Sequence, residues 1–193
     1  YGGWWQSIPS KYRPHIRIDG YQTTEMDYSS VALRIIYARE GMELPDDKDL
    51  YDIGLPNWSP GDDPRRKIIK TYVNAILNDE AGNYRLPKTS QAALGVGHKV
   101  LREMVFERHK PISHLFNSGV GLDAQFIDSQ IAEHVMLSML HEEVLVLPIH
   151  DSFIVRAGYA AWLREDMKKA FREIVEADVS LTIEGSRGNE HFG

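Results

Sequence analysis

The chain has 193 residues, a formal net charge of −6, 42% apolar and 26% charged residues, and no cysteine. Its length suits one domain or one compact core with a subdomain, and its composition is that of an ordinary globular protein. Disulfides, thiolate zinc sites and cysteine nucleophiles are excluded, and the lack of cysteine fits a reducing cytoplasm. No stretch approaches the roughly 18 apolar residues of a membrane span, and no signal peptide pattern opens the chain, so we expect no membrane partner.

Turn residues and apolar spacing predict an α+β fold, in which a few hairpin strands pack under several helices. The pair Asp19-Gly20 between two extended runs is typical of a tight hairpin turn. The aromatic-rich residues 1–12 are expected to be irregular. The expected elements are, in chain order, strands near 15–18 and 22–27, helices over about 30–40, 64–78, 90–109 and 122–141, a strand pair around residue 151, a helix over 158–176 and a strand over 179–183, with loops over 45–63 and 79–90.

Lysine and arginine gather in two places, although the net charge is negative and argues mildly against a nucleic-acid partner. Either cluster is equally well interpreted as a solvated helix face or as a nucleic-acid contact. The first cluster consists of Arg65, Arg66, Lys67 and Lys70, and the second of His98, Lys99, Arg102, Arg108, His109 and Lys110.

Two short strings carry the chemistry, and each places one aspartate at the edge of an apolar, strand-like run. Asp27 follows the run near 22–26, and Asp151 follows residues 144–149. Two carboxylates delivered by adjacent strands are suited to a two-metal site, because Mg²⁺ prefers hard oxygen ligands and takes few protein carboxylates. The alternative is that both aspartates are strand-end caps.

The string from Asp27 to Arg34, Asp-Tyr-Ser-Ser-Val-Ala-Leu-Arg, resembles the first catalytic motif of family A DNA polymerases, the DNA polymerase I type. His150-Asp151 resembles their third catalytic motif, and with Ser152-Phe153 it is still more similar to that of phage-type single-subunit RNA polymerases. Arg66 and Lys70 resemble the Arg-x-x-x-Lys helix that grips the incoming triphosphate. The resemblance covers about residues 20–155 and is nearest to a compact phage or prophage branch.

This resemblance implies a right-hand, palm-like antiparallel sheet with packed helices and reduced fingers. It implies a single core over 1–193 with a fingers-like insertion at about 45–120, acting in the cytoplasm of a bacterial or phage-infected cell. The implied partners are a nucleic-acid template and primer and nucleoside triphosphates. Because the family's thumb has no counterpart in this sequence, an additional subunit or a missing thumb region is also expected.

The resemblance also assigns roles to single residues. Asp27 and Asp151 would be catalytic and would hold two Mg²⁺ ions, with the Tyr28 carbonyl as an extra ligand. Arg66 and Lys70 would bind phosphates of the substrate. His150 would touch the primer end or only orient its hairpin. Gln125 occupies the family's glutamine position, where it would read the minor groove, or it is an ordinary polar helix residue.

Departures from the family pattern leave the product and the activity open. Family A DNA polymerases place a glutamate five residues after the first aspartate as a steric gate against the ribose 2′-hydroxyl, and Ala32 stands there. The site is therefore expected to admit ribonucleotides. The family's aromatic-Gly pair is absent after Lys70, so the alternative is an inactive nucleic-acid-binding or scaffold module. A two-metal nuclease with Glu25 and Asp128 as further acids is a weaker third hypothesis.

Overall fold

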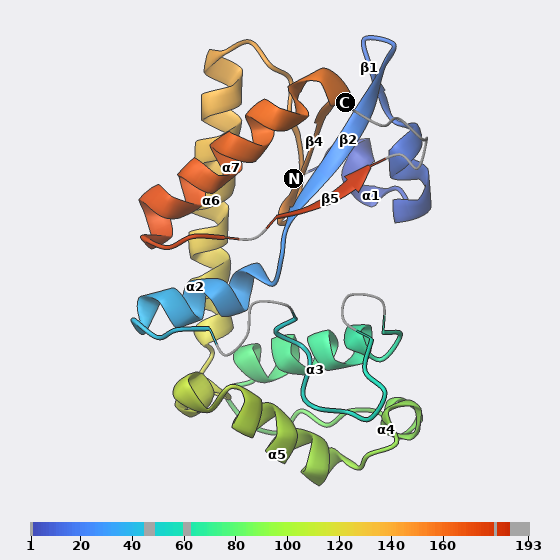
Figure 1. Cartoon of the computed structure of the whole chain (residues 1–193), viewed down its shortest axis with the longest axis vertical. Helices are drawn as coiled ribbons and strands as arrows, with labels where there is room; N and C mark the ends of the chain where they lie inside the picture. Colours follow the sequence, from blue (N-terminus) through green and yellow to red (C-terminus); the bar gives the residue numbers. More distant parts are fainter. Residues whose placement is uncertain (1, 45–48, 60–62, 180, 186–193) are drawn as a thin grey trace. The chain divides into compact units, whose positions relative to one another are not determined.

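A computed structural model describes residues 2–44, 49–59, 63–179 and 181–185 (Figure 1). The chain divides into two compact units. The first unit comprises residues 1–31 and 127–193, and the second comprises residues 32–126. The predicted insertion over 45–120 falls within the second unit. Of the predicted loop over 45–63, residues 45–48 and 60–62 lie outside the described residues.

The first unit is built on an antiparallel sheet with the long strand β2 at its centre (Figure 1). Strand β4 pairs with one edge of β2 and carries β3 beyond it, while β5 pairs with the other edge and the short β1 forms a hairpin with β2. This arrangement confirms the predicted α+β fold. The strands are β1 (Arg17–Ile18), β2 (Tyr21–Tyr28), β3 (Leu147–Ile149), β4 (Ser152–Arg156) and β5 (Leu181–Gly185).

The two faces of this sheet are covered by different elements. On one face, the Tyr28 ring lies 6.4 Å from the Phe153 ring and 5.8 Å from that of Phe171, which belongs to α7 (Ala160–Val175). On the other face, Trp5 of α1 (Trp4–Ser7) packs against an apolar cluster. That cluster consists of Ile16, Ile18, Leu147, Ile149 and Ile154.

The first hairpin confirms the turn that its sequence predicts. Ile18 pairs with Tyr21, so the turn consists of Asp19 and Gly20, both with left-handed backbone at φ 53° and 80°. Asp and Gly tolerate this conformation at low cost. The expectation of an irregular segment over 1–12 was wrong, because α1 and the 3₁₀ helix η1 (Ser10–His15) form there and delay the start of β1 to Arg17.

The second unit is helical over its described residues. Its helices are α2 (Val31–Arg39), α3 (Arg66–Asn78), α4 (Lys88–Leu94), α5 (His98–Arg108) and the 3₁₀ helix η2 (Lys110–Leu115). The single helix expected over 90–109 is instead two helices, because Gly95 takes a left-handed conformation (φ 72°) that ends α4. The loop predicted over 79–90 also ends early, since α4 begins at Lys88.

Helix α6 (Val120–His141) begins in the second unit and continues in the first. Its buried stripe is formed by Ile127, Ile131, Val135 and Met139, at intervals of four residues. The predicted inward residues Phe126 and Leu140 lie outside this stripe and are 64% and 69% exposed. In the part of the chain that the structure describes, none of the helices has the length and hydropathy needed to cross a membrane.

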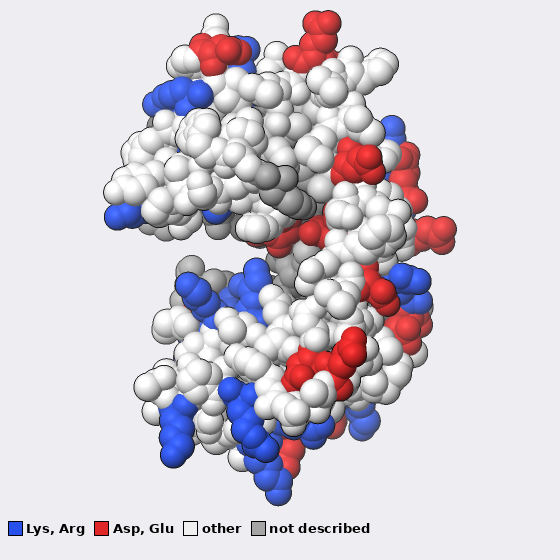
Figure 2. All heavy atoms as spheres, turned by 180° about the vertical axis from the view of Figure 1, so that it is seen from behind, with Lys and Arg blue, Asp and Glu red and all other residues white. Residues whose placement is uncertain are grey.

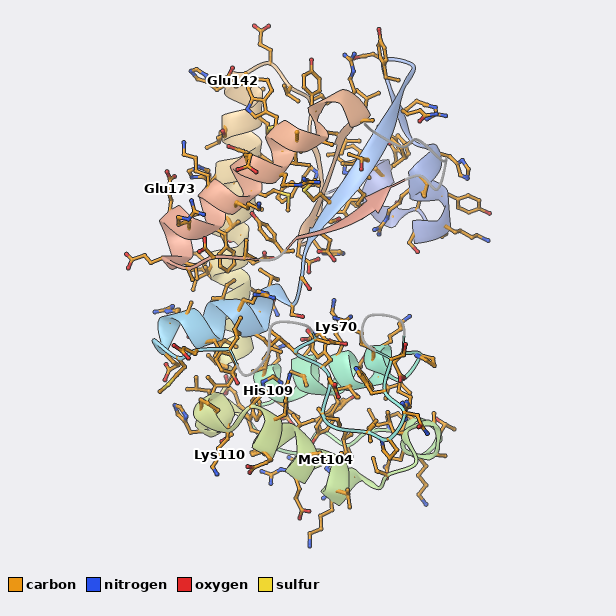
Figure 3. All side chains as sticks on the ribbon, viewed as in Figure 1. Lys70, Met104, His109, Lys110, Glu142 and Glu173 are labelled. Atoms are coloured by element: carbon orange, nitrogen blue, oxygen red, sulfur yellow. The ribbon has the colours of Figure 1, made fainter. Side chains whose placement is uncertain are left out.

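His109 is fully buried in the second unit, whereas the next residue, Lys110, lies exposed at its surface (Figure 3). Its Nε2 lies 3.0 Å from the carbonyl oxygen of Leu50, which can only accept, so this nitrogen carries the proton and donates it. Nδ1 therefore accepts from the Tyr37 hydroxyl at 3.2 Å. Burial, and then the charge of Arg108, lower the pKa of His109 to about 4. His109 is thus a neutral structural group and no part of a basic cluster.

We expect this histidine to make the fold sensitive to acid. In the unfolded chain its pKa is about 6.5, so the stability that neutral His109 provides is complete above that pH and is lost as the pH falls toward 4. The free energy of unfolding should fall by about 2 to 3 kcal/mol over this range. Urea denaturation at pH 7 and pH 4.5 would measure it. His109→Gln should flatten the profile and exposed His114→Gln should not; identical profiles for the two variants would contradict the assignment.

Candidate active site

The strand register brings the two predicted catalytic aspartates to the same end of neighbouring strands. Asp27 of β2 pairs with Ser152 of β4. Ile149 pairs with Ser152 across the β3–β4 hairpin, so its two turn residues are His150 and Asp151. The backbone N–H of Tyr28 donates to the carbonyl oxygen of Asp151 at 3.2 Å. Asp27 and Asp151 are therefore backbone neighbours, and both are half-buried.

A hydrogen-bonded chain fixes the sheet face on which Asp27 lies. Residues 25 and 27 alternate to one face of β2, and residue 152 opposite faces the same way. The Ser152 hydroxyl donates to Glu25 Oε1 at 2.7 Å, and Arg13 Nη1 donates to the same oxygen at 2.9 Å. Glu25 is 9% exposed, so its charge is neutralised by Arg13 close to the two aspartates. The sequence pattern gave no signal for this Arg13 contact, which bridges residues far apart from Ser152.

Asp128 on α6 adds a third carboxyl group to this part of the first unit. Burial and then the negative charge of Asp151 raise the pKa of Asp128 to about 7. Burial, followed by the charges of Asp128 and Asp166, also raises the pKa of Tyr28 far above its usual range. The end of β2 is thus an acidic environment, in which carboxylates crowd one another and a cation would relieve the repulsion.

Replacing Asp128 should stabilise the fold at high pH only. Its pKa is raised on folding, so ionising it costs stability as the pH rises from about 4 toward 7, and this cost is complete at pH 8. We expect Asp128→Asn to raise the free energy of unfolding by about 2 to 4 kcal/mol at pH 8 and by far less at pH 4.5. Urea denaturation at both pH values measures it, with exposed Glu133→Gln on α6 as the control. An equal effect at both values would refute the role given to Asp128.

The donor set at the strand ends fits magnesium. Among the described residues, no group of three or more His, Asp or Glu side chains is placed to hold a metal ion. A pair such as Asp27 and Asp151 nevertheless suits Mg²⁺, which usually binds one or two protein carboxylates and fills its other positions with water and phosphate oxygens. The Tyr28 side chain is not available to a metal, because its hydroxyl donates to the Met167 carbonyl oxygen at 2.7 Å. Only its backbone carbonyl remains as the predicted extra ligand.

His150 lies beside a cavity of about 460 Å³ in the first unit. It is exposed, and its backbone is left-handed (φ 52°), which is uncommon for a residue other than glycine. Trp5 borders the same cavity and is anchored through its Nε1, which donates to the Pro148 carbonyl oxygen at 3.0 Å. His150 therefore presents its ring at the tip of a tight turn whose flank is held by the N-terminal segment.

The predicted phosphate-binding residues lie on α3 of the second unit. Arg66 and Lys70 are four residues apart and share a helix face. Arg66 Nε lies 3.1 Å from both carboxylate oxygens of the buried Asp49, and its guanidinium lies 4.9 Å from the centre of the Tyr51 ring. Lys70 is half-buried and, with respect to the described residues, makes no ion pair (Figure 3). Asp49 thus orients Arg66 through one nitrogen and leaves the terminal amino groups of the fork for another ligand.

The other predicted residues of this unit have different surroundings. Arg65 is held by Asp63 at 2.6 Å and by the carbonyl oxygens of Pro56 and Asn57, so it fastens the loop before α3. Exposed Gln125 donates to Asn78 Oδ1 at 3.2 Å. Ala32 is half-buried in the first turn of α2.

Comparison with known proteins supports the fold. No protein-family model matches the sequence, and no curated protein matches it. Among solved structures, the chain is similar to the POL domain of Pol1 from M. smegmatis in complex with DNA primer-template and dNTP, with a TM-score of 0.54 and 14% identity. The match covers 92% of this chain and 43% of that one, so the chain spans less than half the length of that polymerase domain. At this identity the likeness establishes a fold that resembles a DNA polymerase I polymerase domain.

Proposed function

We propose that the protein is a template-dependent nucleotidyltransferase that extends a primer with nucleotides. The observation that carries this proposal is the register of β2 against β4, which sets Asp27 and Asp151 at adjacent strand ends in a fold resembling a DNA polymerase I domain. The similar structure is a complex with primer-template DNA and dNTP, and we extend those ligands to this chain as part of the proposal.

In this proposal each residue has a separate task. Asp27 and Asp151 would hold two Mg²⁺ ions, with the Tyr28 carbonyl as an additional ligand. When bound, these ions supply activation of the primer 3′-hydroxyl and neutralise the charge of the triphosphate. Arg66, oriented by Asp49, and Lys70 would bind the phosphates of the incoming nucleotide. His150 would contact the primer end, and Gln125 the minor groove of the product duplex.

The proposal includes ribonucleotides as substrates. Ala32 presents only a methyl group at the position where the resemblance places a sugar gate, and a small side chain cannot exclude a 2′-hydroxyl by bulk. A thumb would be supplied by a further region or by another subunit, since the chain covers less than half of the similar polymerase.

Primer extension tests the function directly. The purified protein is given a labelled primer on DNA and on RNA templates, with Mg²⁺ and either dNTPs or NTPs. Template-directed addition that stops when Mg²⁺ is removed would support the proposal. No addition on any template with either substrate would overturn it.

One observation favours the second candidate, an inactive nucleic-acid-binding or scaffold module. Arg66 already has a carboxylate partner in Asp49 and a ring contact with Tyr51, which is also how a purely structural arginine is held. Under this alternative, oligonucleotides would bind but would not be extended, so binding and extension measured side by side separate the two candidates.

A further inference from the structure

Four cations of the second unit lie outside the residues assigned to catalysis. Arg85 precedes α4, Lys88 begins it, and Lys99 and Arg102 lie in the first turns of α5. All four are exposed, and none of them forms an ion pair with another described residue. Figure 2 shows lysine and arginine side chains gathering over this part of the unit.

A glutamine joins the two helices and holds these cations in one region. Gln91 Nε2 donates to the Leu86 carbonyl oxygen at 2.7 Å, and its Oε1 accepts from the backbone N–H of His98 at 2.9 Å. The segment that carries Arg85 is thereby tied to the start of α5. The pKa of His98 is lowered by burial and then by the charges of Arg85 and Arg102, which places both guanidinium groups near one imidazole.

Nearby carboxylates do not neutralise this region. The side chain of Asp79 accepts the backbone N–H groups of Ala81 and Tyr84, so it is used within its own loop. Exposed Glu103, next to Arg102 on α5, makes no ion pair among the described residues. The cations therefore remain available to an external anion.

Aromatic rings lie among the cations. The Tyr84 ring lies 6.1 Å from the ring of Tyr72, which in turn lies 5.7 Å from the His98 ring. Arg102 stacks its guanidinium 4.1 Å from the centre of the Phe106 ring, so the planar group is already oriented. Cations interleaved with aromatic groups are typical of surfaces that bind single-stranded nucleic acids, where the charges follow the phosphates and flat groups stack on the bases.

We propose that Arg85, Lys88, Lys99 and Arg102 form a binding surface for the phosphate backbone of single-stranded nucleic acid. The proposal goes beyond the proposed function, because the surface would serve a polymerase and an inactive module alike. We call these four residues the α4–α5 basic surface.

The test measures the binding of a fluorescein-labelled 20-nucleotide oligo-dT by anisotropy between 50 and 200 mM salt. The variant changes all four residues to glutamine. The control changes Arg164, Lys168, Lys169 and Arg172 of α7 to glutamine, which gives the same net charge on the other unit. We expect the α4–α5 variant to bind about 10²-fold more weakly at low salt, with a log–log salt slope shallower by about 3, and the control to bind within threefold of the unchanged protein.

Further arms keep the outcome decisive. Circular dichroism checks that the variant is folded, and Arg85→Lys with Arg102→Lys should retain most of the binding. Equal binding by variant and control would overturn the proposal, as would a loss confined to duplex DNA. Asp27→Asn with Asp151→Asn should still bind oligo-dT. If that protein and the unchanged one both bind but neither extends a primer, the proposed function fails while this surface stands; if extension succeeds and the α4–α5 variant binds normally, only the surface fails.

Discussion

Asp27→Asn and Asp151→Asn should each lower the rate of nucleotide incorporation by at least about 10³-fold, because each removes a negative charge from a site built to hold Mg²⁺. Asparagine keeps the size of the side chain and one of its oxygens, so the β2–β4 register should survive. The Tyr28 N–H···O bond to Asp151 is a backbone contact and is unaffected by the side chain. Single-turnover primer extension at saturating Mg²⁺ measures the chemical step.

Asp19→Asn provides a matched control for this prediction. Asp19 lies in the turn before β2, at the opposite end of the strand from Asp27, and its left-handed backbone suits asparagine equally well. Its substitution removes the same charge and should leave incorporation within twofold. Comparable losses in Asp19→Asn and Asp27→Asn, or full activity in Asp151→Asn, would show that the strand-end aspartates are not the catalytic pair.

The fold could be predicted from the sequence largely because its signals are local. Asp19-Gly20 specifies a two-residue turn, and the apolar runs before Asp27 and Asp151 specify strands that end at those residues. Helix boundaries were less accessible. Gly95 and Gly97 were visible as breakers within the expected helix over 90–109, but whether one glycine bends a helix or ends it depends on the packing of the two halves.

The surroundings of the candidate site could not be predicted, because they depend on contacts between distant residues. Asp49 reaches Arg66 across 17 positions, and Leu50 reaches His109 across 59. No periodic pattern links such pairs, so the second basic cluster was expected to include a histidine that proves to be buried and neutral. The effect of Asp151 on Asp128 likewise arises only once α6 packs beside the β3–β4 hairpin. What the sequence specifies well is the pair of strand ends, and what folding adds is their electrostatic environment.

Ala32→Glu should convert a site that accepts ribonucleotides into one that rejects them. The added carboxyethyl group would occupy the space of a ribose 2′-hydroxyl, and exclusion by bulk discriminates more strongly than a lost contact. We expect kcat/KM for NTPs to fall about 10²-fold, with a change below threefold for dNTPs. Glutamate in the first turn of α2 is favourable toward the helix dipole, so folding should be preserved. Single-nucleotide incorporation with paired dNTP and NTP substrates measures the ratio.

Two companion variants separate bulk from charge at this position. Ala32→Gln has the size of glutamate without its charge and should discriminate to a similar degree, whereas Ala32→Ser is small and should behave like the unchanged protein. If only the glutamate variant discriminates, repulsion of the substrate by charge is at work and the steric argument fails. If the unchanged protein already rejects NTPs, sugar selection rests on another residue, and the meaning attached to the small side chain at position 32 is withdrawn while the role of the aspartate pair is untouched.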